Sequence, residues 1–267
     1  MRLLEFSTTE GRHRLGLVVE NGVADLTARH PGRAQSLRHL LRQPDWRRFV
    51  DATATADLPL EGVIHEPIAA SSGRVFVFSS TSNGPAWFSK VPGSLVGHDQ
   101  PLWLPLDHVS FRVGACVAAV LGWAADGWRG GRRISADRAH ELVAGYTCIA
   151  DGFVVEARSE GLSASGNFER SSSIGPSFVT ADEFGGRAPA GGTIRIDGVE
   201  VTEQASSPAS SLDELISSLS RIVELRPGDV IGAVPSIVTG DLQAGQTIEV
   251  ELEGVGVLRN QVITEPR

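Results

Sequence analysis

Lysine is almost absent from this chain. Lys90 is the only lysine among 24 basic residues, and the other 23 are arginines. A coding bias toward arginine, alanine and glycine accounts for the scarcity, but it does not explain why position 90 keeps its lysine. The arginines are scattered along the sequence, and the formal net charge is −8. Because nucleic-acid binding needs a basic patch or stripe, we expect no nucleic-acid partner.

Cysteine and long apolar runs are scarce as well. Cys116 and Cys148 are the two cysteines, and both stand among apolar residues. We therefore expect reduced, buried thiols rather than a disulfide framework. Residues 1–16 hold no apolar core of signal-peptide length, and no run approaches the roughly 20 apolar residues that a membrane helix needs. These absences predict a cytoplasmic protein with no membrane partner.

The hydrophobic pattern divides the chain into a small N-terminal domain with its linker, 1–70, and a larger domain, 71–267. Two alternating runs joined by Asn21-Gly22 predict a β-hairpin. Leucines at helical spacing predict a short helix at 37–41 that ends before Pro44. The pattern loosens at 59–70, which predicts the linker.

The larger domain alternates between short strands and a few helices. The expected elements are a strand at 74–78, a buried strand at 111–122, a helix at 135–144, a hairpin around Asp197-Gly198, a helix that begins at Ser211 with a Ser211–Glu214 capping box and runs to Pro227, and alternating strands over 247–263. No internal repeat is visible. The pattern predicts an α+β fold.

Four stretches together resemble the fumarylacetoacetate hydrolase family, in its bacterial branch. They are "GYTCIADGF", "SSSIGPSFVTADEF", "LISSLSRIVELRPGDVI" and "LQAGQTIEVELEGVGVLRNQV", in that order. The N-terminal segment is similar to the family's small leading domain, so the resemblance covers nearly the whole chain. It implies a twisted, mixed β-roll core, a homodimer and a pocket at one end of the roll.

The resemblance also implies a metal site that this chain has lost. Family members hold Mg²⁺ or a similar ion with a Glu-x-Glu pair and a later Asp, and the ion stabilises the enolate of a dicarbonyl acid. Counting back from Gly122, the pair falls on Gly114 and Cys116, and only Asp151 matches a ligand. Weak, substrate-assisted binding by Asp151 alone is the alternative. Asp151 with one thiol is too small a set for zinc, so we expect no metal and no other cofactor.

Further departures point the same way. The family's His-Glu lid has no room between the first strand and the Phe-x-Lys segment, Gly166 stands where the family has a pocket lysine, and Ala233-Val234-Pro235 replaces a Gly-Thr-Pro element. The resemblance matches Lys90 to a retained pocket lysine and Glu169 to a retained acidic residue.

Asp151 and Lys90 are the candidate catalytic residues. A carboxylate lined by Gly114, Cys116 and Phe153 is desolvated, which raises its pKa unless Lys90 or an arginine pairs with it, and such a group serves as acid or base. Lys90 is suited to hold a substrate carboxylate or enolate, or to form a Schiff base. The structural alternatives are that Asp151 caps a turn and that Lys90 is a solvated loop residue. Neither is expected to build the core.

Two loops are expected to frame the pocket mouth, one at 79–84 and a serine-rich one at 159–173. Hydroxyls and amides there are suited to hold a polar small-molecule substrate, although such loops are equally often solvated connections. Cys116 lacks a histidine partner and is disfavoured as a nucleophile. The predicted substrate-binding residues are Ser80, Ser82, Asn83, Phe88, Gly114, Cys116, Phe153 and Glu169.

These sequence features are compatible with two alternative functions. The first is a repurposed, metal-independent enzyme of specialised bacterial metabolism that isomerises, cyclises, decarboxylates or cleaves an enolisable carbonyl substrate. The second is a non-catalytic relative that binds a small molecule or stabilises a partner. We favour the enzyme, because Lys90 and Asp151 survive in a chain with no other lysine.

Overall fold

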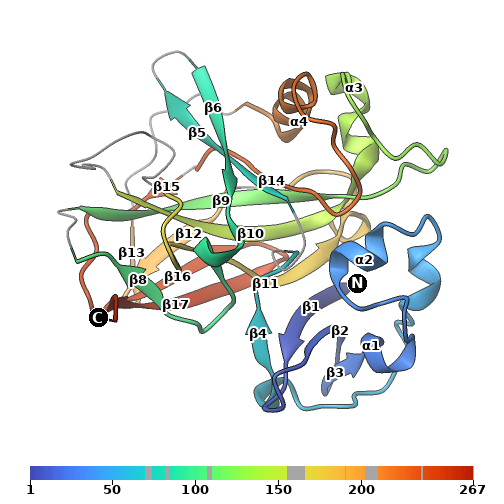
Figure 1. Ribbon diagram of the computed structural model, residues 1–267, viewed down its shortest axis with the longest axis horizontal. Coiled ribbons are helices and arrows are strands. Elements are labelled where there is room, and N and C mark those ends of the chain that lie inside the picture. Colours follow the sequence, from blue (N-terminus) through green and yellow to red (C-terminus); the bar gives the residue numbers. More distant parts are fainter. Residues whose placement is uncertain are drawn as a thin grey trace.

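Two β-sheets dominate the computed structural model, which describes residues 1–69, 74–81, 84–106, 110–154, 166–189, 191–201, 210–235 and 237–266. The larger sheet has twelve strands and is mixed, and the smaller has five (Figure 1). The helices are short and lie around the sheets. The α+β fold expected from the sequence pattern is confirmed.

The twelve-stranded sheet follows the order β3-β2-β1-β11-β10-β9-β14-β5-β6, with β4, β7 and β15 attached beside it. Its strands are β1 (Arg2–Ser7), β2 (His13–Val19), β3 (Gly22–Asp25), β4 (Ile64–Glu66), β5 (Val75–Thr81), β6 (Gly84–Lys90), β7 (Leu95–Val96), β9 (Phe111–Leu121), β10 (Val143–Val154), β11 (Ser172–Thr180), β14 (Val230–Gly232) and β15 (Ile237–Val238). The five-stranded sheet contains β13 (Val199–Glu200), β12 (Thr193–Ile196), β16 (Thr247–Leu252), β17 (Gly256–Thr264) and β8 (Leu102–Leu104).

The N-terminal unit, blue in Figure 1, confirms the expected hairpin and helix. β2 and β3 meet at Asn21-Gly22, where Gly22 has a φ of 144° and a Cβ would lie 2.1 Å from the Leu58 carbonyl oxygen. The helices of this unit are α1 (Leu26–Arg29) and α2 (Leu37–Leu41). Ser36 caps α2, whose three leucines are buried.

The expected linker at 59–70 is wrong in part. β4 lies within it and pairs with β1, because Ile64, His65 and Glu66 satisfy their backbone groups on that strand. β1 also pairs with β11, so the N-terminal unit continues the large sheet. The division of the chain at residue 70 stays a prediction.

β9 and β10 form the centre of the large sheet and pair antiparallel along their whole lengths. Side chains of β9 alternate between two cores. Val113 and Ala115 face the core that contains residues of the five-stranded sheet, whereas Cys116 and Ala118 face the core that contains α2. Because both faces of β9 are covered, its sequence is an almost continuous apolar run.

Two helices differ from the expected lengths. The helix expected at 135–144 is α3 (Ala136–Ala139), which continues as a 3₁₀ turn to Leu142, and from Val143 the chain pairs with β9 instead. α4 (Leu212–Ser220) has the expected capping box but ends before Pro227. Its end follows from Ser220, whose carbonyl accepts from the Arg133 backbone and whose hydroxyl accepts from the Ile134 backbone.

None of the helices in the described part of the chain is long and apolar enough to cross a membrane.

Candidate active site

A buried ion pair joins the two residues that the sequence marks as catalytic. Lys90 is the last residue of β6, and Asp151 lies inside β10. The distance from Lys90 Nζ to Asp151 Oδ1 is 2.5 Å, and the side chains are only 3% and 13% exposed. β6 is an edge strand and β10 is central, so the large sheet curls to bring them together. Lys90 as a solvated residue and Asp151 as a turn cap are both wrong.

The Lys90 ammonium has an acceptor for each of its three protons. Besides Asp151 it donates to the Gly166 carbonyl at 2.6 Å and to Ser172 Oγ at 3.0 Å. The Ser172 hydroxyl also accepts from the Gly152 N–H at 3.0 Å and donates to Asp151 Oδ1 at 3.3 Å. A buried charge is tolerated when it is paired and hydrogen-bonded in this way. Because Lys90 Nζ is engaged in these three contacts, it is poorly placed to act as a Schiff-base nucleophile.

The two carboxylate oxygens of Asp151 differ in their contacts with described residues. Its contacts to Lys90 and Ser172 both use Oδ1. Among the residues that the structure describes, none donates a hydrogen bond to Oδ2. The carboxylate can therefore hold the ammonium with one oxygen and accept a proton with the other.

A proline packs against Gly114, the position that the resemblance predicts for the family's first metal ligand. Gly114 lies directly opposite Asp151 in the β9–β10 register. A Cβ at Gly114 would stand 2.7 Å from both Cβ and Cγ of Pro235. Pro235 closes the Ala233-Val234-Pro235 segment that departs from the family's pattern. Any side chain at position 114 would therefore meet Pro235 unless one of the two segments shifted.

Cys116, the position that the resemblance predicts for the second metal ligand, lies in the core. Cys116 lies opposite Ile149 and belongs to the core cluster that contains both residues. Burial, followed by the nearby Asp151 charge, holds the pKa of the Cys116 thiol well above its usual range. Without a metal, burial therefore favours the protonated thiol, and a single buried thiol is not the set of hard oxygen ligands that Mg²⁺ prefers.

These residues do not fit the ion that the resemblance implies. Asp151 is engaged by Lys90, a Cβ at position 114 would already collide with Pro235, and Cys116 supplies a buried thiol instead of a carboxylate. In the described ranges, no group of three or more His, Cys, Asp or Glu side chains is arranged to hold a metal.

We expect purified protein to carry no stoichiometric divalent ion, because the carboxylates that hard cations require are missing. Elemental analysis after gel filtration without chelator measures this directly. One tightly held Mg²⁺, Mn²⁺ or Zn²⁺ per chain would contradict the prediction.

The other predicted site residues differ in where they lie relative to the ion pair. Phe88 and Phe153 are half-buried and lie two residues from Lys90 and Asp151, on the same strand faces. Glu169 is exposed and lies against Gly93. Ser80 is part of β5 rather than a loop, and its side chain lies outside the described residues, as do Ser82 and Asn83.

Three residues on or beside this site are not among the predicted site residues. Ser172 falls within the serine-rich loop predicted at 159–173, but it begins β11 and its hydroxyl accepts a hydrogen bond from Lys90. Pro235 was noted only as a departure from the family. Arg112 lies on the Asp151 side of β9 and was not singled out, although its position two residues before Gly114 places it on the same face.

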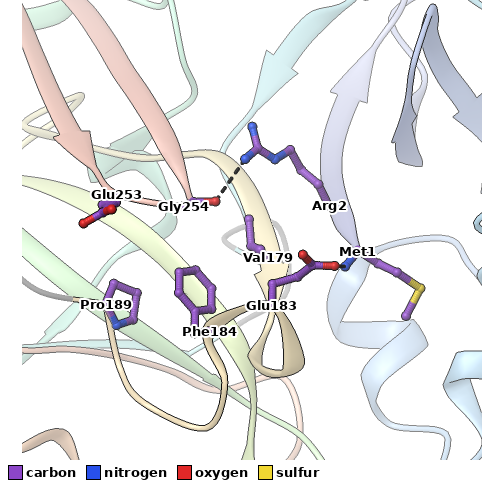
Figure 2. Close-up of a pocket in the computed structure, with 8 residues that line it drawn as sticks. All are labelled: Met1, Arg2, Val179, Glu183, Phe184, Pro189, Glu253 and Gly254. Carbon is purple, nitrogen blue, oxygen red and sulfur yellow. Dashed lines mark hydrogen bonds and ion pairs between the residues drawn. The ribbon is translucent and has the colours of Figure 1, made fainter.

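A separate cavity of about 370 Å³ lies away from this site (Figure 2). Its lining residues are Met1, Arg2, Val179, Glu183, Phe184, Pro189, Glu253 and Gly254. The Met1 ammonium pairs with Glu183 at 2.6 Å, and Arg2 donates to the Gly254 carbonyl at 2.9 Å. Met1 and Arg2 thus connect the N-terminal unit to Glu183, which follows β11, and to the turn between β16 and β17.

Comparison with known proteins assigns the chain to a family. The model of the family described as "Fumarylacetoacetate (FAA) hydrolase C-terminal" matches residues 70–263. The chain belongs to the fumarylacetoacetate hydrolase family.

Its relatives are distant in sequence. The chain is 29% identical over 188 residues to an uncharacterized protein of Pyrococcus abyssi, covering 68% of this chain and 80% of that protein. It is 27% identical over 298 aligned positions to the mitochondrial oxaloacetate tautomerase FAHD2A of Bos taurus, covering 98% of this chain and 92% of that protein.

Solved structures share the fold over the whole chain. A putative HpcE protein from Mycobacterium smegmatis superposes with a TM-score of 0.79 at 26% identity, covering 100% of both chains. Maleylpyruvate hydrolase from Sphingobium sp. SYK-6 superposes with a TM-score of 0.78 at 20% identity, covering 99% of this chain and 100% of that chain. The expected family and fold are confirmed.

Proposed function

We propose that this protein is a metal-independent enzyme that moves a proton at the carbon next to a carbonyl group, and so tautomerises or isomerises an enolisable oxo acid. The observation that carries the proposal is the buried Lys90–Asp151 pair, in which a cation and a carboxylate stand side by side and no described residue donates a hydrogen bond to Asp151 Oδ2. Enolisation needs these two groups, a base for the proton and a positive charge for the oxygen.

The reaction begins when Asp151 Oδ2 takes the proton from the α-carbon. The electron pair of the C–H bond forms a C=C bond, and the carbonyl oxygen becomes an enolate. The Lys90 ammonium stabilises that oxygen when it takes the place of one present acceptor, such as the Gly166 carbonyl. Return of the proton to the oxygen gives the enol, and its return to a conjugated carbon gives the isomer. No other reactant is consumed.

Isomerisation accounts for these contacts better than hydrolysis does. Hydrolysis of a carbon–carbon bond needs an activated water, and among the described residues no histidine or second carboxylate contacts the pair. Decarboxylation and cyclisation pass through the same enolate and remain within the wider proposal. The names of two relatives support this chemistry, namely the oxaloacetate tautomerase and a 4-hydroxyphenylacetate degradation bifunctional isomerase/decarboxylase of Salmonella dublin, which is 28% identical over 196 residues.

The test is hydrogen–deuterium exchange at the α-carbon of oxaloacetate and longer 2-oxo acids, followed by NMR in D₂O with EDTA-treated protein. We expect exchange at about one per second or faster with at least one substrate. Asp151→Asn should slow it by roughly 10²- to 10⁴-fold, the usual share of a general base. Glu251→Gln, in the surface Arg195–Glu251 pair, is the matched control. Exchange no faster than in buffer, or exchange that requires added Mg²⁺, would overturn the proposal.

The non-catalytic alternative has one observation in its favour. All three Lys90 protons already have acceptors inside the protein. A binding protein of this kind would hold an oxo acid without exchanging its α-protons, so the same experiment separates the two functions.

Two finer expectations stay predictions alongside this function, namely a homodimeric state and a place in specialised metabolism. Light scattering of the purified chain tests the first.

A further inference from the structure

Arg112 lies in the row of side chains next to the ion pair. In the β9–β10 register Gly114 faces Asp151, and Arg112 faces Phe153. Same-face residues along a strand are about 7 Å apart. Gly166 lies close to both the ion pair and the Arg112–Phe153 pair of residues. A Cβ at Gly166 would lie 3.2 Å from Lys90 Nζ and 3.7 Å from the Phe153 Cβ. A ligand that covers the ion pair therefore has Arg112 as a near neighbour.

Exposure rises along this face of the two strands toward Arg112. The Cys116–Ile149 row is fully buried, and the Asp151 side chain is 13% exposed. The Arg112 side chain is 39% exposed. The Arg112 row is thus the outer end of the site, where a ligand meets solvent.

The guanidinium of Arg112 is oriented but only partly used. Its Nε donates to Asp241 Oδ1 at 2.7 Å, and Ser110 also donates to that oxygen. These two contacts hold the pKa of Asp241 below its usual range, so the carboxylate stays ionised and keeps the guanidinium in place. In the described residues nothing accepts from the two Nη groups of Arg112. That edge of the guanidinium has the geometry to bind a carboxylate with two parallel hydrogen bonds.

An anionic ligand needs a second cationic group such as the Arg112 guanidinium, because all three protons of the Lys90 ammonium already have acceptors. Lys90 donates to Asp151, Gly166 and Ser172, and Asp151 balances its charge. If the reacting carbonyl oxygen replaces one acceptor of Lys90, no donor remains there for a carboxylate as well.

We propose that Arg112 is a specificity-determining residue that binds a carboxylate of the substrate. The proposal rests on the proposed function, since that function places the reacting carbonyl over the Lys90–Asp151 pair. The Gly114–Asp151 pair and the Arg112–Phe153 pair are about 7 Å apart along the strands. A carbon chain needs several bonds of about 1.5 Å each to span that distance. The carboxylate on Arg112 is therefore remote from the reacting carbonyl, and the preferred substrate is an oxo acid with an acidic group at its far end.

The test compares two oxo acids of equal length, 2-oxoadipate with a far carboxylate and 2-oxohexanoate without one. Deuterium exchange gives KM and kcat for each with the wild type, Arg112→Gln, Arg112→Lys and Arg195→Gln. Arg195 is the matched control, because it is also a half-exposed arginine with a carboxylate 2.7 Å away. We expect the wild type to have a KM for 2-oxoadipate at least about tenfold below that for 2-oxohexanoate, as one charge-assisted contact provides.

In Arg112→Gln the ratio of the two KM values should fall toward one, with a smaller change in kcat. Arg112→Lys should restore part of the ratio, because it keeps the charge without the planar fork. Arg195→Gln should keep the wild-type ratio. An unchanged ratio in Arg112→Gln, or equal loss in both arginine variants, would overturn the assignment.

Calorimetric binding of 2-oxoadipate and adipate covers the case in which neither oxo acid is exchanged. Weaker binding to Arg112→Gln than to the wild type would then support Arg112 as the anchor while the proposed reaction fails. Equal binding, or no binding to either protein, would overturn the Arg112 assignment itself.

Discussion

Replacing Lys90 by methionine is expected to lower the melting temperature by roughly 6 to 20 °C and to slow α-proton exchange by about 10²- to 10³-fold. Removing one partner of a buried ion pair costs about 3 to 5 kcal/mol, because the other charge is left buried and unpaired. In a chain of this size each kcal/mol lowers the melting temperature by about 2 to 4 °C. The loss of rate follows from the loss of the charge that stabilises the enolate. Differential scanning calorimetry and deuterium exchange measure the two effects.

The double variant Lys90→Met/Asp151→Asn separates stability from catalysis. Because it removes both charges, it should melt closer to the wild type than Lys90→Met alone does, and it should remain inactive. The exposed pair Arg195–Glu251 is the control, since removing a surface ion pair costs at most about 1 kcal/mol. A Lys90→Met protein that melts like the wild type would contradict the buried pair. The burial of Lys90 and Asp151 argues against the expectation that neither residue supports the core.

Restoring the family's two carboxylates is expected to damage the protein rather than to recreate a metal site. The Gly114→Glu/Cys116→Glu variant should lose more than about 4 kcal/mol of stability or fail to fold. Overpacking against Pro235 accounts for roughly 1 to 3 kcal/mol, and an unpaired carboxylate in the Cys116 position adds several more. Added Mg²⁺ should not restore the melting temperature, because Asp151 is held by Lys90.

Two single-site variants divide this effect into its parts. Gly114→Ala adds only the Cβ that meets Pro235, and Cys116→Ala tests the packing of the thiol without adding charge. Pro235→Gly in the Gly114→Ala background should recover part of the lost stability. A double glutamate variant that melts like the wild type and binds one Mg²⁺ per chain would contradict this prediction. It would show that the protein still has room for the metal and its ligands.

Local sequence signals predicted those elements that local interactions stabilise. Asn21-Gly22 predicted the turn between β2 and β3, and the Ser211–Glu214 capping box predicted the start of α4. Element ends were less accurate. α3 stops early because β10 begins at Val143, and the pairing of β10 with β9 depends on residues that are distant in the sequence.

The sequence by itself determined which residue types are available to the predicted site. Gly114 and Cys116 cannot supply carboxylates, and the resemblance to the family predicts Lys90, Asp151 and Glu169 as the charged residues of the pocket. Whether Lys90 and Asp151 touch was decided only by the tertiary structure, because the curl of the large sheet brings β6 to β10. The tertiary structure likewise placed Pro235 over Gly114 and Arg112 beside Phe153. Propensities and caps act over a few residues, whereas contacts between distant strands follow from register and sheet curvature, which no single segment encodes.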